Sequence, residues 1–129
     1  MIPVVCPSPL AVMIVDDEAP ARTRLRDLLA DLAPELPNEL VAEAENGFRA
    51  LAAIASRRVD VALIDIQMPR MDGIALACRL SELARPPAVI FVTAFEAYAV
   101  QAFELNVVDY LLKPVRAKRL LTALQKVRP

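Results

Sequence analysis

Short apolar runs alternate five times with segments whose apolar residues recur at helical spacing, and this alternation constrains the fold of the 129-residue chain more than any other feature. The runs at Asp60–Ile64 and Ala88–Val92 are apolar almost throughout, which is typical of strands buried on both faces of a parallel sheet. Right-handed crossover helices then cover both faces. The sequence therefore predicts an α/β fold with a doubly wound, five-stranded parallel sheet.

The expected elements follow one another from residue 11 onwards without a linker. Residues 1–10 contain three prolines and are expected to form a flexible tail, followed by one domain over residues 11–129. The expected strands are Ala11–Val15, Leu40–Glu45, Asp60–Ile64, Ala88–Val92 and Val107–Leu112. The first two expected helices are marked by their apolar faces, Leu25/Leu28/Leu29/Leu32 and Phe48/Leu51/Ile54. The other three expected helices span Ile74–Leu83, Glu96–Leu105 and Arg116–Val127.

Composition excludes several classes of function. The chain is 57% hydrophobic with a net charge of −1, so a folded domain is expected and direct nucleic-acid binding has no electrostatic support. Histidine is absent, which excludes a Ser-His-Asp triad, histidine metal ligands and a phosphohistidine within the chain. Cys6 and Cys78 lack metal-ligand spacing, and the pattern around Cys78 places it in or near the core.

The sequence also shows no sign of export or membrane insertion. The apolar start of the chain lacks a basic segment and contains prolines, so it is a poor signal peptide. No apolar run approaches the roughly 18 residues of a membrane span. We therefore expect a cytoplasmic protein without a membrane partner.

Polar side chains follow four of the expected strands. Asp16 and Asp17 end the first, Asp65 the third, Thr93 the fourth and Lys113 the fifth. Because the carboxyl ends of parallel strands meet at one edge of a sheet, these groups are expected to converge there. As an alternative, the acidic pair also suits the start of a helix, where the dipole favours negative charge.

Three converging carboxylates repel one another and call for a cation. Repulsion amounts to about 4 kcal/mol per close pair at an effective dielectric constant near 20. An oxygen-only site suits Mg²⁺, or Mn²⁺ in its place, rather than Zn²⁺. A carboxylate beside this cation and Lys113 can attack phosphorus and form an aspartyl phosphate, with Thr93 donating a hydrogen bond to a phosphoryl oxygen. The strand ends thus predict phosphoryl chemistry.

These residues also match a family. The segments VDDE (15–18), DIQMPRMDG (65–73), TA (93–94) and DYLLKP (109–114) resemble the receiver domain of two-component response regulators. The resemblance covers nearly the whole chain beyond residue 10 and implies a receiver domain over residues 11–129. It also implies a flavodoxin-like (βα)5 fold with strand order 2-1-3-4-5 and Mg²⁺ as the cofactor.

The resemblance assigns a role to individual acidic positions. Asp65 would be the phosphoacceptor. Asp17 and Asp65 would bind Mg²⁺ directly, Asp16 through water, and Gln67 through its backbone carbonyl.

The remaining site residues receive roles in the same way. Lys113, before an expected cis bond to Pro114, would pair with the phosphoryl group. Thr93 and Tyr110 would be the switch pair, with Thr93 moving toward the phosphoryl oxygens and Tyr110 turning inward to fill the vacated space.

The stretch from Thr93 to Val115 resembles more narrowly the receivers of LytTR-type transcriptional regulators, the LytR/AlgR group. This implies a sensor histidine kinase as phosphoryl donor, and DNA binding only through a C-terminal domain that is not in this chain. A homodimer could form through the fourth helix, fifth strand and fifth helix. Its complementary charges would be Glu96, Glu104 and Asp109 against Arg116, Lys118 and Arg119.

The expected function is a phosphorylation-controlled signalling domain for transcriptional regulation, not an enzyme beyond its own phosphorylation and dephosphorylation. A phosphorylation-independent interaction module is one alternative, although the intact set of acidic, Thr and Lys positions argues against it. A Mg²⁺-dependent phosphatase of haloacid-dehalogenase type is the other. That family expects an Asp-x-Asp element after the first strand, whereas here the isolated aspartate follows the third.

Overall fold

The structure is a computed structural model that describes residues 8–127. Five parallel strands form one sheet in the order β2-β1-β3-β4-β5, as the sequence and the resemblance predicted. The strands are β1 (Leu10–Val15), β2 (Asn38–Ala44), β3 (Val61–Ile64), β4 (Ala88–Thr93) and β5 (Asp109–Leu112). The helices are α1 (Ala19–Leu32), α2 (Gly47–Ser56), α3 (Gly73–Ser81), α4 (Ala99–Glu104) and α5 (Ala117–Val127).

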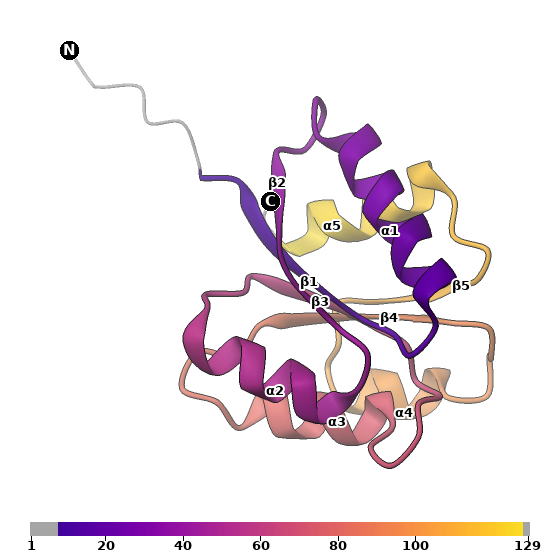
Figure 1. Ribbon diagram of the computed structural model, residues 1–129. Helices are drawn as coiled ribbons and strands as arrows, with labels where there is room; N and C mark the ends of the chain where they lie inside the picture. The colour runs from indigo at the N-terminus through magenta and orange to yellow at the C-terminus, as the bar shows by residue number, and fades with distance from the viewer. Residues whose placement is uncertain (1–7, 128–129) are drawn as a thin grey trace.

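The sheet separates two layers of helices. Helices α1 and α5 cover one face, while α2, α3 and α4 cover the other (Figure 1). Alternate residues of the central strands enter opposite cores: Leu63 and Ile90 pack with α1 and α5, whereas Ile64 and Phe91 pack with the other helices. All of β3 is buried, so the continuous apolar runs of the sequence reflect burial on both faces.

Most element ends lie within two residues of their predicted positions, the usual uncertainty of helix and strand termini. The predicted tail is too long, because Leu10 is buried and begins β1, donating its N–H to the Pro37 carbonyl at 2.9 Å. Residues 1–7 of that tail lie outside the described residues. Strand β2 starts earlier than predicted at Asn38, whose side chain donates to the carbonyls of Leu29 and Leu36.

The predicted apolar face of α2 is partly wrong. Phe48 is 52% exposed instead of lying in the core. Gly47 and Ala50 are the buried residues of this helix. The Met71 side chain lies so close to Gly47 that a larger residue at position 47 fits only if Met71 moves. Small residues at helical spacing therefore face the sheet, and the aromatic ring faces outward.

Helix α4 is shorter than the predicted span of Glu96–Leu105. Its first residue is preceded by Tyr98, whose side chain makes no capping hydrogen bond to the helix. Ala102 is buried, whereas Val100 and Phe103 are 71% and 85% exposed. One apolar side of this helix therefore faces the core, and another is left exposed.

The predicted pairing of Asp109 with a cation of a second copy is wrong, because Asp109 pairs within its own chain. Its carboxylate accepts hydrogen bonds from Arg119 at 2.7 and 2.8 Å and from Lys126 at 2.8 Å within the same chain. The Arg119 guanidinium, and to a lesser degree Lys126, hold the pKa of Asp109 well below its usual range. Asp109 and Arg119 therefore join β5 to α5 instead of awaiting a second copy.

Replacing Asp109 with Asn is expected to destabilise the fold by about 1–2 kcal/mol at neutral pH, because charge-assisted hydrogen bonds from two cations are lost. A carboxyl with a lowered pKa stabilises the fold above its unfolded pKa, near 3.9, and this contribution is lost as the pH falls through the folded value. Urea unfolding of both proteins at pH 7 and pH 3 measures this. A difference that stays constant or grows toward pH 3 would contradict the assignment.

No described helix combines the length and the apolar composition that crossing a lipid bilayer requires.

Candidate functional site

The carboxyl edge of the sheet brings together three of the predicted site residues. Asp16 and Asp65 are both buried, and Lys113 reaches between them from the end of β5. The Lys113 Nζ atom lies 2.9 Å from Asp16 Oδ2 and 3.3 Å from Asp65 Oδ2. The Lys113–Pro114 bond is cis, as the resemblance implied, and the Lys113 N–H donates to the Thr93 carbonyl at 2.9 Å.

The charges in this group shift one another's pKa. Burial raises the pKa of the Asp65 carboxyl, and Lys113 opposes this without reversing it. Burial would lower the pKa of Lys113, but its hydrogen bond to Asp16 and the negative charges of both aspartates raise it instead. Lys113 is therefore a fixed cation, and Asp65 is a carboxylate held in an environment that disfavours its charge.

Two buried oxygens of the site have no hydrogen-bond partner among the described residues. They are Oδ1 of Asp65 and Oγ1 of Thr93. Buried polar atoms in folded proteins are nearly always satisfied, and the exceptions concentrate where an ion, a water or a ligand binds. Both atoms lie at the ends of adjacent strands, so a ligand rich in oxygen or a cation bound there would give them the polar partners that they lack.

Two of the predicted metal ligands lie in a cluster of carboxylates at the start of α1. Oxygens of Asp16, Asp17 and Glu18 lie within 4.8 Å of one another, and Glu18 is not among the predicted ligands. Asp65 contacts this cluster through Lys113, which also touches Asp16. Asp16 Oδ1 accepts the Glu18 N–H at 2.9 Å, so one of its oxygens is engaged within the turn that starts α1.

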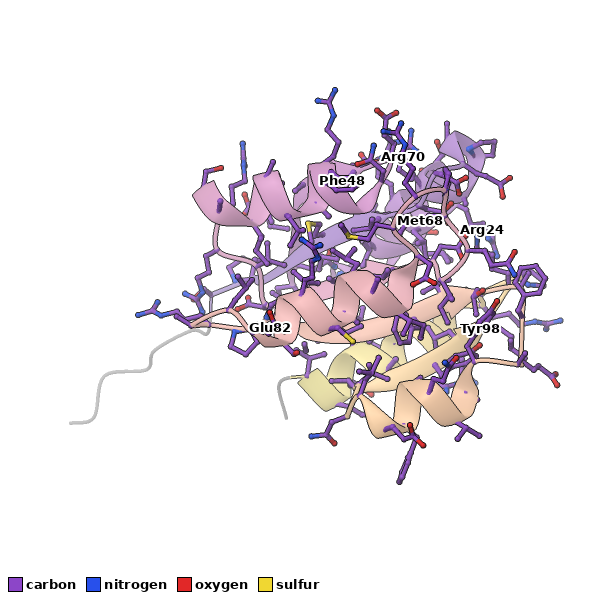
Figure 2. The ribbon with its side chains drawn as sticks, turned by 90° about the horizontal axis from the view of Figure 1, so that it is seen from below. Arg24, Phe48, Met68, Arg70, Glu82 and Tyr98 are labelled. Carbon is purple, nitrogen blue, oxygen red and sulfur yellow. The ribbon has the colours of Figure 1, made fainter. Side chains whose placement is uncertain are left out.

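Gln67 contacts Tyr98, a residue that the sequence did not indicate as part of the site. Its side-chain amide donates to the Tyr98 hydroxyl at 3.2 Å, which joins the β3–α3 loop to the residue before α4. Figure 2 labels Tyr98 and Met68, which line one cavity of about 380 Å³ beside the site. The contact spans 31 residues of sequence, and no local pattern could have indicated it.

The predicted switch pair occupies adjacent strands, and the two side chains share no hydrogen bond in the described chain. Thr93 is fully buried at the end of β4, whereas Tyr110 of β5 is half-buried. The Tyr110 hydroxyl donates to the Phe95 carbonyl, and its ring meets the Phe91 ring edge-on at a centroid distance of 6.3 Å. Tyr110 thus fastens the loop that follows Thr93.

Gly73 shapes the loop after Asp65 through a close backbone approach. Its N–H donates to the Ile66 carbonyl at 2.7 Å, and an added Cβ would lie 2.4 Å from the Asp65 carbonyl oxygen. This clash involves backbone atoms that no side-chain rotation can relieve. The Asp-Gly pair at 72–73 therefore serves packing, with Asp72 capping α3 through the Ala75 N–H at 2.8 Å.

Replacing Gly73 with Ala is expected to destabilise the fold by about 2–4 kcal/mol, because the backbone beside Asp65 must move. Gly47→Ala is the matched control: its Cβ would meet only the flexible Met71 side chain. The control should lose no more than about 1 kcal/mol in urea unfolding. Equal losses in the two variants would show that the close approach to Asp65 is unimportant.

Comparisons with known proteins agree with this geometry. The family model for the response regulator receiver domain matches residues 12–125. The positive alginate biosynthesis regulatory protein of Pseudomonas aeruginosa is 47% identical over 115 residues, which is 89% of this chain and 46% of that protein. The transcriptional regulatory protein LytR of Staphylococcus aureus is 40% identical over 119 residues, 92% of this chain and 47% of that protein.

Solved structures give the same result. The response regulatory domain of protein mrkE from Klebsiella pneumoniae superposes with a TM-score of 0.83 at 36% identity, over 92% of this chain and 94% of that chain. The chain spans about half the length of the curated relatives it matches.

Proposed function

The chain belongs to the receiver domains of two-component response regulators, with relatives that include those of the LytR/AlgR group, and on that premise we propose that it accepts a phosphoryl group on Asp65 from a sensor histidine kinase. The phosphorylated domain would then switch an output surface for transcriptional regulation. It is a regulator's receiver rather than a member of a known catalytic family, and we assign it only its own phosphorylation and dephosphorylation.

The observation that carries this proposal is the state of the Asp65 carboxylate. It is buried at the carboxyl edge, next to a fixed cation, with one oxygen that has no hydrogen-bond partner in the described chain. That oxygen is the nucleophile: it forms a bond to phosphorus while the phosphorus–nitrogen bond of the donor phosphohistidine breaks. The leaving imidazole takes up a proton.

The residues present fit a divalent cation. The carboxylates of Asp16, Asp17 and Asp65 supply only oxygen donors, and such a donor set suits Mg²⁺, or Mn²⁺ in its place. We assign Asp17 and Asp65 as direct ligands, Asp16 as a ligand through water, and Gln67 as a ligand through its carbonyl. When bound, the cation neutralises charge that develops on the transferring group.

Lys113 and Thr93 complete the proposed chemistry. The ammonium of Lys113 already touches Asp65, so it can pair with a phosphoryl oxygen without a large movement. Thr93 has an unpartnered hydroxyl at the adjacent strand end, which can donate to another phosphoryl oxygen. Phosphorylation adds about −1.5 to −2 charges, and both donors would orient toward them.

The switch would follow from the Thr93 hydroxyl moving toward the phosphoryl group. Space beside β4 then opens, and the Tyr110 ring can turn inward if its hydroxyl releases the Phe95 carbonyl. Burial of the tyrosine ring favours this inward state. The Tyr110 ring already contacts the buried Phe91 ring edge-on, so an apolar neighbour for the inward state is present.

The proposed output surface is formed by α4, β5 and α5. Its exposed apolar residues, Val100, Phe103 and Leu112, suit a homodimer of phosphorylated domains. The relatives named as regulatory proteins are about twice as long as this chain, and in this proposal a further domain binds DNA. A cytoplasmic location, where the kinase domain acts, belongs to the same proposal.

Acetyl phosphate and beryllofluoride titrations test this function. Uptake of one phosphoryl group or a stable fluoride complex, each requiring Mg²⁺ and accompanied by a change at Tyr110, is expected. Steady turnover of phosphomonoesters would favour a phosphatase of haloacid-dehalogenase type. Absence of both an adduct and a fluoride complex would favour a phosphorylation-independent interaction module.

A further inference from the structure

A cavity of about 530 Å³, which we name the α2–α3 cavity, lies at the edge of the sheet opposite Asp65. Part of its lining precedes β3, at Arg57, Arg58 and Val59, and part precedes β4, at Leu83 and Arg85. Because parallel strands begin at one edge and end at the other, the cavity and the phosphorylation site face opposite ends of the domain. Figure 2 shows Glu82 at the C-terminal end of α3, across the molecule from Met68 and Arg70.

The wall of this cavity is apolar. Leu51 and Ile54 of α2 are partly buried, Val59 is buried, and Leu83 is 37% exposed. A half-enclosed cavity of this volume has the size of a site that binds one large side chain or a small ligand. The apolar wall therefore offers a place where an apolar group can leave water.

The rim carries one sign of charge. Arg57 and Arg58 belong to the α2–β3 loop, Arg85 belongs to the α3–β4 loop, and no carboxylate lines the cavity. Arg58 forms an exposed pair with Asp60 at 3.4 Å. In the part of the chain that the structure describes, Arg57 and Arg85 have no ion pair, so two guanidinium groups on separate loops lack an anionic partner.

We propose that the α2–α3 cavity docks an acidic segment of a partner protein, in which an apolar side chain is flanked by carboxylates. The apolar side chain enters the cavity, and the carboxylates pair with Arg57 and Arg85 on the two loops. Arginine clusters recognise acidic motifs through charge-assisted, often bidentate hydrogen bonds, and buried apolar anchors dominate binding at such surfaces. This docking is independent of Asp65 chemistry.

The test uses a synthetic peptide with a central Leu-Phe pair flanked by two glutamates on each side, acetylated and amidated at its ends, titrated calorimetrically into the purified chain. Binding that weakens with added salt is expected. Arg57→Glu and Arg85→Glu should each weaken binding about tenfold or more, since a charge-assisted contact becomes a repulsion. Arg49→Glu makes the same charge change on α2 outside the cavity lining, and this variant should bind as the parent does.

Further arms make the outcome decisive. A peptide with serines in place of the Leu-Phe pair and one with lysines in place of the glutamates should both fail to bind. Equal binding of the serine peptide, loss of binding in Phe103→Ala instead of the arginine variants, or no binding at millimolar peptide would overturn the proposal. So would binding of decanoate at the arginines without binding of the peptide, because the cavity would then be a small-molecule site.

Discussion

Asp65→Asn should take up no phosphoryl group at all from acetyl phosphate, while the unsubstituted chain gains one. The amide that replaces the carboxylate offers no anionic nucleophile, and Lys113 keeps its contact with Asp16 at 2.9 Å. Because burial raises the pKa of the Asp65 carboxyl, ionising this group costs more free energy in the folded state than in the unfolded state. The uncharged Asn should therefore leave Tm unchanged or raise it.

Intact-protein mass spectrometry after reaction with acetyl phosphate and Mg²⁺ measures this loss, and circular dichroism checks the fold. Asp27→Asn is the control, since Asp27 is exposed on α1 and has no ion pair within the described residues. It should incorporate phosphate like the parent. Normal incorporation in Asp65→Asn would mean that another side chain is the phosphoacceptor.

Lys113→Ala is expected to have the second largest effect, on both stability and switching. Removing this cation leaves the buried carboxylates of Asp16 and Asp65 without their positive counter-charge, which should destabilise the fold by about 3 kcal/mol. Mg²⁺ should still bind and recover part of that loss. The phosphoryl group would lack its ammonium partner, so Tyr110 should not respond to phosphorylation.

Urea unfolding with and without Mg²⁺ measures the stability, and NMR of the Tyr110 ring reports the switch. Lys118→Ala, an exposed lysine of α5, should stay within about 0.5 kcal/mol of the parent. Lys113→Arg keeps the charge and provides a folded variant if the alanine protein does not fold. A normal Tyr110 response in Lys113→Ala would contradict the role given to the ammonium.

The pattern of apolar residues predicted the architecture because it can be read from short stretches of sequence. Apolar runs such as β3 are buried on both faces, and this property alone predicts a parallel sheet covered by two helical layers. The convergence of Asp16, Asp65 and Lys113 follows from the same topology, since parallel strands end together. The individual roles within the site came from the resemblance, not from the pattern.

The features that were missed depend on contacts between distant residues. The α2 pattern could not show that Met71 fills the space over Gly47 and leaves Phe48 outside. The hydrogen bond between Gln67 and Tyr98 and the pairing of Asp109 with Arg119 both join separate loops or elements. The arginine rim of the α2–α3 cavity arises likewise from two loops that only the fold brings together.

The hydrogen bonds around Lys113 also bear on regioselectivity. Asp16 and Asp65 are both buried aspartates in contact with the same ammonium, so side-chain identity alone does not distinguish them. Both side-chain oxygens of Asp16 are already acceptors, one from the Glu18 amide and one from Lys113, whereas Asp65 retains one uncommitted oxygen. Of these two carboxylates, only Asp65 therefore presents an entering electrophile with an oxygen that accepts no hydrogen bond in the described chain, because the turn after β1 supplies the Glu18 amide to Asp16.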